Sequence, residues 1–180
     1  MDRLVKGYVQ IYTGDGKGKT TAAVGQAVRS VGNGLKVYML QFLKTGETGE
    51  LDIAKLIGDK FQIFRFQTQE GFFWNLNDEE KAILQTEVNT AYDFAMEVVK
   101  NDKCDVFILD EIMGVLSNKL LSEEQVMELI DKKPINMELI LTGRNAPKSI
   151  MEKADLVTNM KKVKHYIDKG IYAREGIEFW

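Results

Sequence analysis

The segment that most constrains the fold is TGDGKGKT, residues 13–20, which stands between a strand-like and a helix-like stretch near the start of the chain. Before it, residues 7–12 read GYVQIY, a short β-rich run that is typical of a buried strand. After it, residues 19–31 place small or apolar side chains at helical spacing, and the glycines at 32 and 34 end the pattern. A strand, a glycine-rich loop and a helix in this order predict a loop that binds the phosphates of a nucleoside triphosphate.

The match to the usual phosphate-loop pattern, GxxxxGK[ST], is incomplete because Thr13 stands where the first glycine is expected. The other residue types suit the chemistry, since glycines let successive backbone N–H groups face one anion and the helix N-terminus adds partial positive charge. Lys19 is expected to reach the terminal phosphates, and the Thr20 hydroxyl to ligate Mg²⁺ or Mn²⁺. The alternative is a glycine-rich turn that only caps a helix. The residues predicted to bind the nucleotide here are Thr13, Gly14, Asp15, Gly16, Lys17, Gly18, Lys19, Thr20 and Thr21.

Charged residues follow two further strand-like runs. Asp110 and Glu111 come directly after VFIL, and an acidic residue at the end of a neighbouring strand holds the metal in phosphate-loop enzymes. Alone, such an ending is as often the start of a loop. With the phosphate loop, it predicts a metal site made of Thr20, Asp110 and Glu111, and leaves open which carboxylate touches the ion. Arg144 follows another strand end, where its planar cation either contacts phosphate or forms an ion pair with a helix.

The rest of the chain alternates between strand-like and helix-like segments. The run DVFILD is too continuously apolar to have a solvent face, which is typical of strands in covered parallel sheets. The alternation predicts an α/β fold of the P-loop NTPase type, with a mostly parallel sheet flanked by helices, in a single domain spanning residues 1–180. Further strands are expected at residues 36–42, 61–66, 105–110, 137–141 and 155–163, and further helices at 78–100, from a capping box at 122–125 to about 132, and at 147–153. The inner face of the 78–100 helix is expected to comprise Ile83, Leu84, Val88, Ala91, Ala95, Val98 and Val99.

The amino-acid composition limits which kinds of molecule this protein is expected to bind. A formal net charge of −3 provides no global positive field for nucleic acid. The single cysteine, Cys104, allows no internal disulfide and no multi-cysteine metal site, and the single histidine, His165, is interpreted as structural or interfacial. No apolar run approaches the roughly 20 residues of a membrane span. We therefore expect a cytoplasmic protein that binds neither nucleic acid nor membrane.

Several nucleotide enzymes fit poorly. The segment Asn118-Lys119-Leu120-Leu121 lacks the aspartate of the guanine-reading NKxD signature, and one cysteine cannot build the zinc lobe of a thymidine-kinase-like enzyme. A recombinase or helicase motor is expected to show a basic or aromatic groove for DNA, whereas the one tight basic cluster is Lys161, Lys162 and Lys164.

Four ordered motifs carry a resemblance to a known family. The loop TGDGKGKTTAA, the strand end ILDEI, the segment LTGRNAPKSIMEKADLVTNM and the tail VKHYIDKGIYAREGIE resemble the ATP:corrinoid adenosyltransferases of the CobA/BtuR/CobO type. The resemblance runs from about Gly7 to Glu178, and a phosphate loop without its first glycine is among its most specific parts. Only about six residues precede the first expected strand, whereas some members of the family carry a longer N-terminal extension that folds over the site.

This resemblance implies a RecA-like fold and an enzyme that transfers the 5′-deoxyadenosyl group of ATP to the cobalt(I) of a corrinoid, such as cob(I)yrinic acid a,c-diamide or cobalamin, releasing triphosphate. It implies ATP and a reduced corrinoid as substrates, Mg²⁺ or Mn²⁺, a homodimer, and an electron donor such as a flavoprotein. In the family the nucleotide lies reversed relative to ordinary phosphate-loop enzymes. Two other classes stay open: a kinase or RecA-like ATPase that acts on another macromolecule, and a module that only carries corrinoid.

Three consecutive aromatic residues, Phe72, Phe73 and Trp74, follow Gly71 and are hard to bury in one helix or strand. Some of them are therefore expected to line a cavity, although a core-anchoring cluster is the alternative. By resemblance to the family's F-x-W motif, Phe72 and Trp74 would press on the lower face of the corrin and displace its axial ligand, which makes cobalt(II) easier to reduce. The residues expected to act in catalysis are Lys19, Thr20, Phe72 and Trp74.

Overall fold

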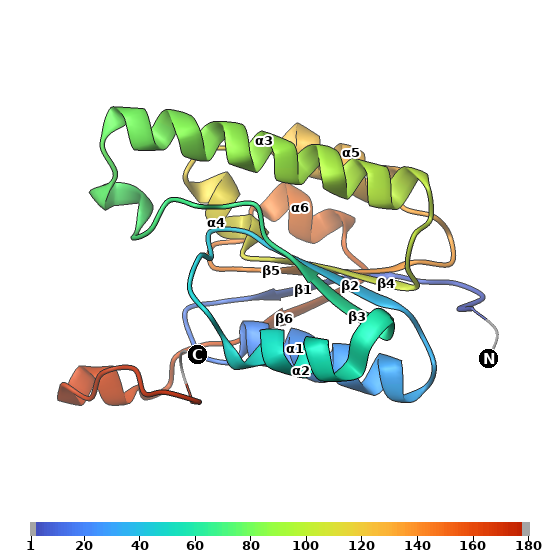
Figure 1. Cartoon of the computed structure of the whole chain (residues 1–180), viewed down its shortest axis with the longest axis horizontal. Helices are drawn as coiled ribbons and strands as arrows, with labels where there is room; N and C mark the ends of the chain where they lie inside the picture. Colours follow the sequence, from blue (N-terminus) through green and yellow to red (C-terminus); the bar gives the residue numbers. More distant parts are fainter. Residues whose placement is uncertain (1–2, 178–180) are drawn as a thin grey trace.

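The computed structural model describes residues 3–177 and has a central six-stranded sheet with helices on both faces (Figure 1). Every strand pair is parallel, and the strand order is β3-β2-β4-β5-β1-β6. The strands are β1 (Val9–Thr13), β2 (Val37–Gln41), β3 (Phe61–Phe64), β4 (Val106–Asp110), β5 (Glu138–Thr142) and β6 (Leu156–Asn159). The predicted α/β fold with a parallel sheet flanked by helices is confirmed. The two ends of the proposed single domain, residues 1–2 and 178–180, lie outside the described residues.

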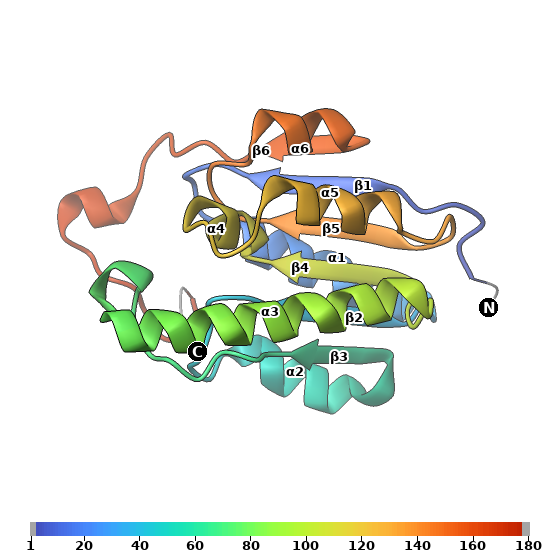
Figure 2. The same ribbon diagram turned by 90° about the horizontal axis from the view of Figure 1, so that it is seen from above.

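The helices divide between the two faces of the sheet. Helices α1 (Lys19–Gly32) and α2 (Gly49–Ile57) cover one face. The other face carries α3 (Asp78–Lys100), α4 (Ile112–Ser117), α5 (Glu123–Asp131) and α6 (Lys148–Lys153). Seen from above, α3, α5 and α6 lie across this second face in that order, from the β3 edge toward the β6 edge (Figure 2). Three single-turn 3₁₀ helices, η1 (Gly58–Lys60), η2 (Phe73–Asn75) and η3 (Tyr166–Lys169), complete the described elements.

Both faces of the central strands are buried, as the continuous apolar runs predict. In β2, Val37 and Met39 join the cluster that contains Ala23 and Ala27 of α1, whereas Tyr38 and Leu40 join the cluster beneath α3. The side chains of a strand alternate between its faces, so one apolar run supplies two cores. Small alanines on α1 let that helix lie close to the sheet, and this fixes the N-terminus of α1 at the edge where the strands end.

Helix α3 begins and ends where its pattern predicts. Asn77 and Glu80 form a reciprocal capping box, in which the Asn77 side chain accepts from the Glu80 N–H at 2.9 Å and the Glu80 carboxylate accepts from the Asn77 N–H at 2.8 Å. Six of the seven predicted inner positions are buried, but Ile83 is 41% exposed and its assignment was wrong. Leu84 and Val88 already fill the stripe that faces the sheet, so Ile83 lies beside that stripe.

Three other differences come from short elements. The sequence indicated neither α2 nor α4. Helix α2 buries only Ala54, and α4 has six residues with an apolar pattern that resembles a strand. The last strand is β6, shorter than the predicted 155–163, and all of its residues are exposed because it stands at the edge of the sheet. An edge strand that buries little has no strong hydrophobic pattern to define its length.

The carboxyl ends of all six parallel strands meet along one edge of the sheet. Two segments extend beyond this edge (Figure 1): the connection from β3 to α3, on the side of α3, and residues 160–177 after β6, on the side of α1. In open parallel sheets, ligands bind at this edge. Within the described part of the chain, no helix has the length and apolar character needed to cross a membrane.

Candidate functional site

Thr13 occupies the position of the missing first glycine because it is still a strand residue. It pairs with Asn159 of β6, and its buried hydroxyl oxygen accepts a hydrogen bond from the Ala146 N–H at 3.2 Å. A residue in regular strand conformation with a bonded side chain has no need of glycine's backbone freedom. The departure from the standard pattern is therefore compatible with a folded phosphate loop.

The glycines at 14 and 16 are explained by the segment that follows β6. The Gly16 N–H donates to the Met160 carbonyl oxygen at 2.7 Å, and a Cβ atom at Gly16 would lie only 2.6 Å from that oxygen. Gly14 has φ near +108°, and its Cβ would lie 2.5 Å from the same atom. Both positions thus require glycine because the backbone that follows β6 lies directly against the loop. The sequence did not indicate this contact.

Lys19 and Thr20 open α1 and face a cavity of about 170 Å³. Lys19 is buried, with 7% of the residue exposed, and its ammonium donates to the Gly16 carbonyl oxygen at 2.9 Å. Burial lowers the pKa of this ammonium, and the nearby Glu111 opposes the shift. Loop cations, a hydroxyl and a carboxylate thus meet around one space, whose lining comprises Lys17, Gly18, Lys19, Thr20, Thr21, Glu111 and Ile177.

Asp110 is fully buried and accepts four hydrogen bonds. Its Oδ1 accepts from the hydroxyls of Thr20 at 2.9 Å and Thr142 at 2.6 Å. Its Oδ2 accepts from the Lys44 ammonium at 2.6 Å and from the Gln41 amide at 3.2 Å. Both oxygens are therefore already engaged by the protein, and Asp110 acts as the hub that joins the ends of β2, β4 and β5 to the phosphate loop.

Glu111 differs from Asp110 because it lines the cavity. Its backbone is left-handed, with φ near +61°, and its N–H donates to the Thr142 hydroxyl at 2.9 Å. Burial raises the pKa of its carboxyl, Asp110 adds to this, and Lys44, Lys19 and Arg144 act in the opposite direction. A partly buried carboxylate beside a hydroxyl suits a hard cation such as Mg²⁺, which takes one or two protein oxygens and completes its shell with phosphate and water. Within residues 3–177 no group of three or more acidic, histidine or cysteine side chains is placed to hold a metal alone.

Arg144 lies at the same edge of the sheet. Its charge influences the pKa of Asp15, Lys19 and Glu111, although its own side chain is exposed. Among residues 3–177 its guanidinium takes part in no described hydrogen bond or ion pair, so the predicted ion pair with a helix is not formed. The other prediction, contact with a phosphate, remains open. Asp15 is exposed at the loop tip, where its carboxylate accepts from the Lys162 N–H at 3.0 Å, and this bond lowers its pKa.

The sequence missed Lys44, Gln41 and Thr142, which complete the surroundings of Asp110. The sequence did contain a signal for this contact. Gln41 ends β2 and Lys44 follows three residues later, and β2 and β4 are neighbouring parallel strands, so these residues end at the same edge as Asp110. His165 precedes η3 and accepts from the Ile167 N–H through Nδ1 at 3.1 Å.

Of the three consecutive aromatic residues, Phe73 is packed against the core and Phe72 and Trp74 are exposed. Phe73 packs against the core, and the Lys81 ammonium lies 5.5 Å from its ring centre. Phe72 and Trp74 are 64% and 71% exposed, and their rings stack in parallel with centroids 4.8 Å apart. These two side chains therefore do not anchor the core, and none of the described cavities includes them. They form a flat apolar surface on the segment that extends beyond the sheet edge.

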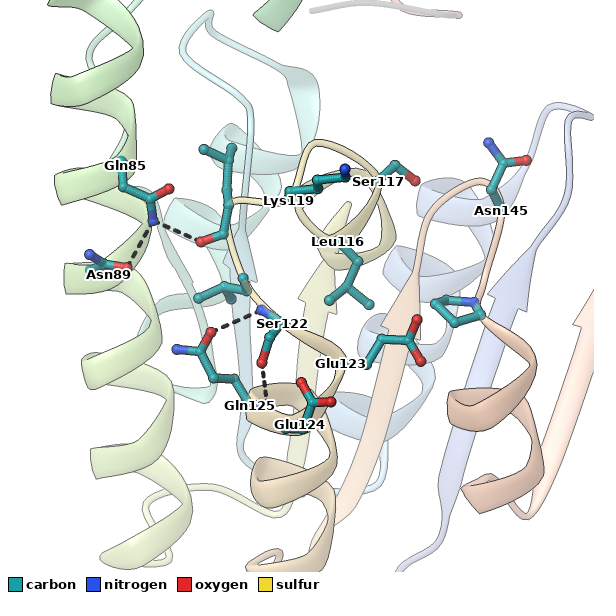
Figure 3. Close-up of a pocket in the computed structure, with 13 residues that line it drawn as sticks. Gln85, Asn89, Leu116, Ser117, Lys119, Ser122, Glu123, Glu124, Gln125 and Asn145 are labelled. Carbon is teal, nitrogen blue, oxygen red and sulfur yellow. Dashed lines mark hydrogen bonds between the residues drawn. The ribbon is translucent and has the colours of Figure 1, made fainter.

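The largest described cavity, about 720 Å³, lies elsewhere and contains no phosphate-loop residue (Figure 3). It lies between α3 and the start of α5. The Gln85 amide spans part of it, donating to Asn89 Oδ1 at 3.1 Å and to the Leu120 carbonyl oxygen at 2.8 Å. Ser122 and Gln125 form the cap of α5. Several of the polar side chains that line this cavity thus already form hydrogen bonds within or between helices.

Replacing Thr142 by valine is expected to lower the free energy of unfolding by about 1–3 kcal/mol. The change removes a donor to Asp110 and the acceptor of the Glu111 N–H, while side-chain volume is nearly kept. Urea unfolding measures the effect, with Thr90→Val, an exposed position on α3, as the control that should change stability by less than about 0.5 kcal/mol. Equal stabilities of the two variants would show that the Asp110 hub contributes little.

The sequence matches one family model over nearly its full length. The family is described as ATP:corrinoid adenosyltransferase BtuR/CobO/CobP, and the match covers residues 5–179. Among similar proteins, the corrinoid adenosyltransferase of Escherichia coli K12 is 33% identical over 175 residues, which cover 97% of this chain and 86% of that protein. The corrinoid adenosyltransferase of a Sinorhizobium species is 35% identical over 177 residues, covering 97% of this chain and 81% of that protein.

Among solved structures, the chain is similar to the flagellar accessory protein FlaH of Methanocaldococcus jannaschii. The TM-score is 0.52 at 15% identity, and the match covers 86% of this chain and 71% of that one. At this identity the similarity concerns the fold alone, and it agrees with the predicted RecA-like arrangement.

Proposed function

The chain belongs to the ATP:corrinoid adenosyltransferase family, and on that premise we propose how its own residues transfer the 5′-deoxyadenosyl group of ATP to a reduced corrinoid. The observation that carries the proposal is the pairing, at one edge of the sheet, of a cation-lined phosphate loop with an exposed stack of two aromatic rings. The first suits a polyphosphate and the second suits the flat face of a macrocycle.

The reaction needs a nucleophile and a leaving group but no general base. Cobalt(I) of the corrinoid donates an electron pair to C5′ of ATP, the cobalt–carbon bond forms, and the C5′–O5′ bond breaks. Its electrons leave with the triphosphate oxygen, and the cobalt becomes formally cobalt(III). Since no proton moves, the protein's contribution is to position the two substrates and to stabilise the charge of the triphosphate.

We assign that stabilisation to the phosphate loop. Apart from that of Gly16, which donates to Met160, the backbone N–H groups from Gly14 to Lys19 would surround the departing triphosphate, together with the Lys19 ammonium and the more exposed Lys17. Thr13, Asp15 and Thr21 shape the loop and the start of α1, and Arg144 would contact the triphosphate from the end of β5. In this role the loop holds a triphosphate that leaves as one piece, instead of presenting a terminal phosphate for transfer.

For the metal we propose Thr20 and Glu111 as direct ligands and Asp110 as their support. The Thr20 hydroxyl donates its proton to Asp110, so its oxygen lone pairs are free to face the cavity that Glu111 lines. Mg²⁺, or Mn²⁺, bound there would neutralise part of the triphosphate charge. Asp110 has no free oxygen, since protein donors engage both.

Two variants test whether Glu111 is the metal ligand and Asp110 its support. Glu111→Gln is expected to raise the Mg²⁺ concentration for half-maximal rate by about tenfold or more, with little change in stability. Asp110→Asn removes the nearer of the two carboxylates that pair with Lys44, at a fully buried position, and is expected to cost about 3 kcal/mol of stability. Metal titrations of the initial rate and urea unfolding separate the two effects. The assignment is reversed if Asp110→Asn alters metal dependence while Glu111→Gln does not.

Phe72 and Trp74 are proposed to press on the lower face of the corrin and to displace its axial ligand. Cobalt(II) without that donor accepts an electron more easily, which would let a modest donor such as a flavoprotein supply it. We further propose that the protein works in the cytoplasm as a homodimer, in cobalamin biosynthesis or salvage, with cob(I)yrinic acid a,c-diamide or cobalamin as the corrinoid.

Product analysis tests the proposed function. The protein is incubated anaerobically with ATP, Mg²⁺ and chemically reduced cobalamin, and phosphorus NMR follows the nucleotide. Triphosphate together with a light-sensitive alkylcobalamin spectrum is the expected result. ADP and inorganic phosphate would instead indicate a kinase or ATPase, and tight corrinoid binding without ATP consumption would indicate a carrier.

A further inference from the structure

Two buried side-chain oxygen atoms in the described chain accept no hydrogen bond. Both lie near the start of the connection from β3 to α3, residues 65–77, which carries Phe72 and Trp74 and is called the aromatic segment below. They are Oε1 of Gln67, just after β3, and Oε2 of Glu87, on α3. Both side chains line the same small cavity of about 10 Å³. A buried acceptor without a donor costs about 1–3 kcal/mol, so two in one cavity call for an occupant that donates to both.

The walls of this cavity supply no spare donor. Apart from Gln67 and Glu87 they are apolar side chains and Gln41. The Gln41 amide nitrogen already donates to Glu50 at 3.0 Å and to Asp110 at 3.2 Å, and its oxygen accepts from Arg65. The occupant must therefore bring two donors in a space close to the roughly 10–15 Å³ that one water requires.

Glu87 also fixes the adjoining backbone directly. Its other oxygen, Oε1, accepts from the Thr68 N–H at 3.1 Å and from the Thr68 hydroxyl. Among described residues, every hydrogen bond that joins residues 67–71 to the rest of the chain goes to Glu87. Figure 1 shows this connection running alongside the N-terminal half of α3 before it turns at the helix end.

The chain on both sides of residues 67–71 packs against the core. Before them, the Phe66 ring packs on Phe94 of α3, with centroids 5.4 Å apart. After them, Phe73 packs against the core and Asn77 caps α3. Between them, Gly71 has φ near +96°, a conformation with wide backbone freedom. Phe73 thus anchors the chain between the two exposed rings, and the hold on residues 67–69 fixes the chain that leads into Phe72.

We propose that one water molecule bridges Gln67 Oε1 and Glu87 Oε2, and that Glu87, through this water and through Thr68, is a positioning residue for Phe72 and Trp74. The inference rests on the proposed function for its consequence in catalysis, but the water site itself does not. Glu87 touches neither substrate; it holds the base of the aromatic segment so that the ring pair meets the corrin in one orientation.

The test compares Glu87→Ala with Glu87→Gln and with Glu79→Ala, an exposed carboxylate on the same helix. The glutamine can donate an N–H to the bridging water, which still donates to Gln67, and its oxygen can still accept from Thr68, so it should keep the bridge. Hydrogen exchange of the amides of residues 66–70 is expected to rise about tenfold or more in Glu87→Ala and to stay near wild type in the other two. Unchanged exchange in Glu87→Ala would overturn the role of Glu87.

The catalytic readout is the ratio of two rates, one from cobalt(II) with a weak reductant and one from pre-formed cobalt(I). Glu87→Ala is expected to lower this ratio about tenfold or more, and Glu87→Gln to restore it to within about threefold. Equal losses on both substrates would contradict a positioning role. A high-resolution crystal structure of the wild type should show a water within hydrogen-bond distance of both oxygens, and a dry cavity would contradict the bridge. If the wild type forms no adenosylcorrinoid, the proposed function fails, while the exchange and crystallographic results still decide the water site.

Discussion

Replacing Lys19 by methionine is expected to lower kcat/KM for triphosphate release by about 10²–10³-fold, the usual cost of removing one preorganised group that stabilises developing charge. Methionine keeps most of the buried stem and removes only the ammonium. In the wild type this ammonium is bonded within the loop, where burial lowers its pKa and water screens its charge less than at the surface.

The matched control is Lys17→Met, in the same loop. Lys17 is exposed, so its charge is screened, and we expect a loss of about tenfold or less. Steady-state kinetics with pre-reduced cobalamin measure both, and thermal unfolding confirms that both variants are folded. If Lys19→Met stays within about threefold of wild type, or if the two variants lose equally, the buried ammonium does not stabilise the leaving group.

The second large effect is expected from Trp74→Ala. The rate from cobalt(II) under a weak reductant should fall by about 10²-fold or more, because one half of the stacked ring pair is lost and the axial ligand is no longer displaced. The rate from pre-formed cobalt(I), which needs no assisted reduction, should stay within about threefold. Since Trp74 is 71% exposed, stability should change by less than about 0.5 kcal/mol.

Phe73→Ala provides the contrast, because Phe73 packs against the core under the same segment. Its loss should reduce stability and lower both rates together. Electron paramagnetic resonance of the bound cobalt(II) adds an independent readout, since loss of the axial ligand changes the spectrum. Equal losses of the two rates in Trp74→Ala, with the spectrum unchanged, would remove the redox role of the ring pair.

The features predicted correctly from sequence are local. The phosphate loop, the strand ending at Asp110 and the 23-residue helix α3 each lie in one continuous segment with its own pattern and caps. Hydrophobic periodicity and capping residues act over a few neighbours, so they can be read without knowing the fold. They were enough to predict a parallel α/β sheet with a nucleotide site at its edge.

The features missed depend on residues that are far apart in sequence. Lys44 pairs with Asp110 across 66 residues, and Met160 lies on Gly14 and Gly16 from the far end of the chain. Such contacts follow from strand order, which the sequence pattern does not specify. Glu87 was missed for the same reason, because it lies outside the inner stripe of α3 and becomes informative only beside Gln67.

The central claim, that C5′ of ATP is the atom transferred, is tested most directly by a single turnover with ATP carrying ¹³C at C5′. Enzyme in excess, Mg²⁺ and cobalt(I) cobalamin are mixed anaerobically in the dark, and carbon and phosphorus NMR are recorded on the same sample. We predict that the labelled carbon becomes a cobalt-bound methylene and that one triphosphate appears for each cobalt alkylated. A labelled carbon that stays in ADP or ATP, with inorganic phosphate as the only new phosphorus product, would contradict the account.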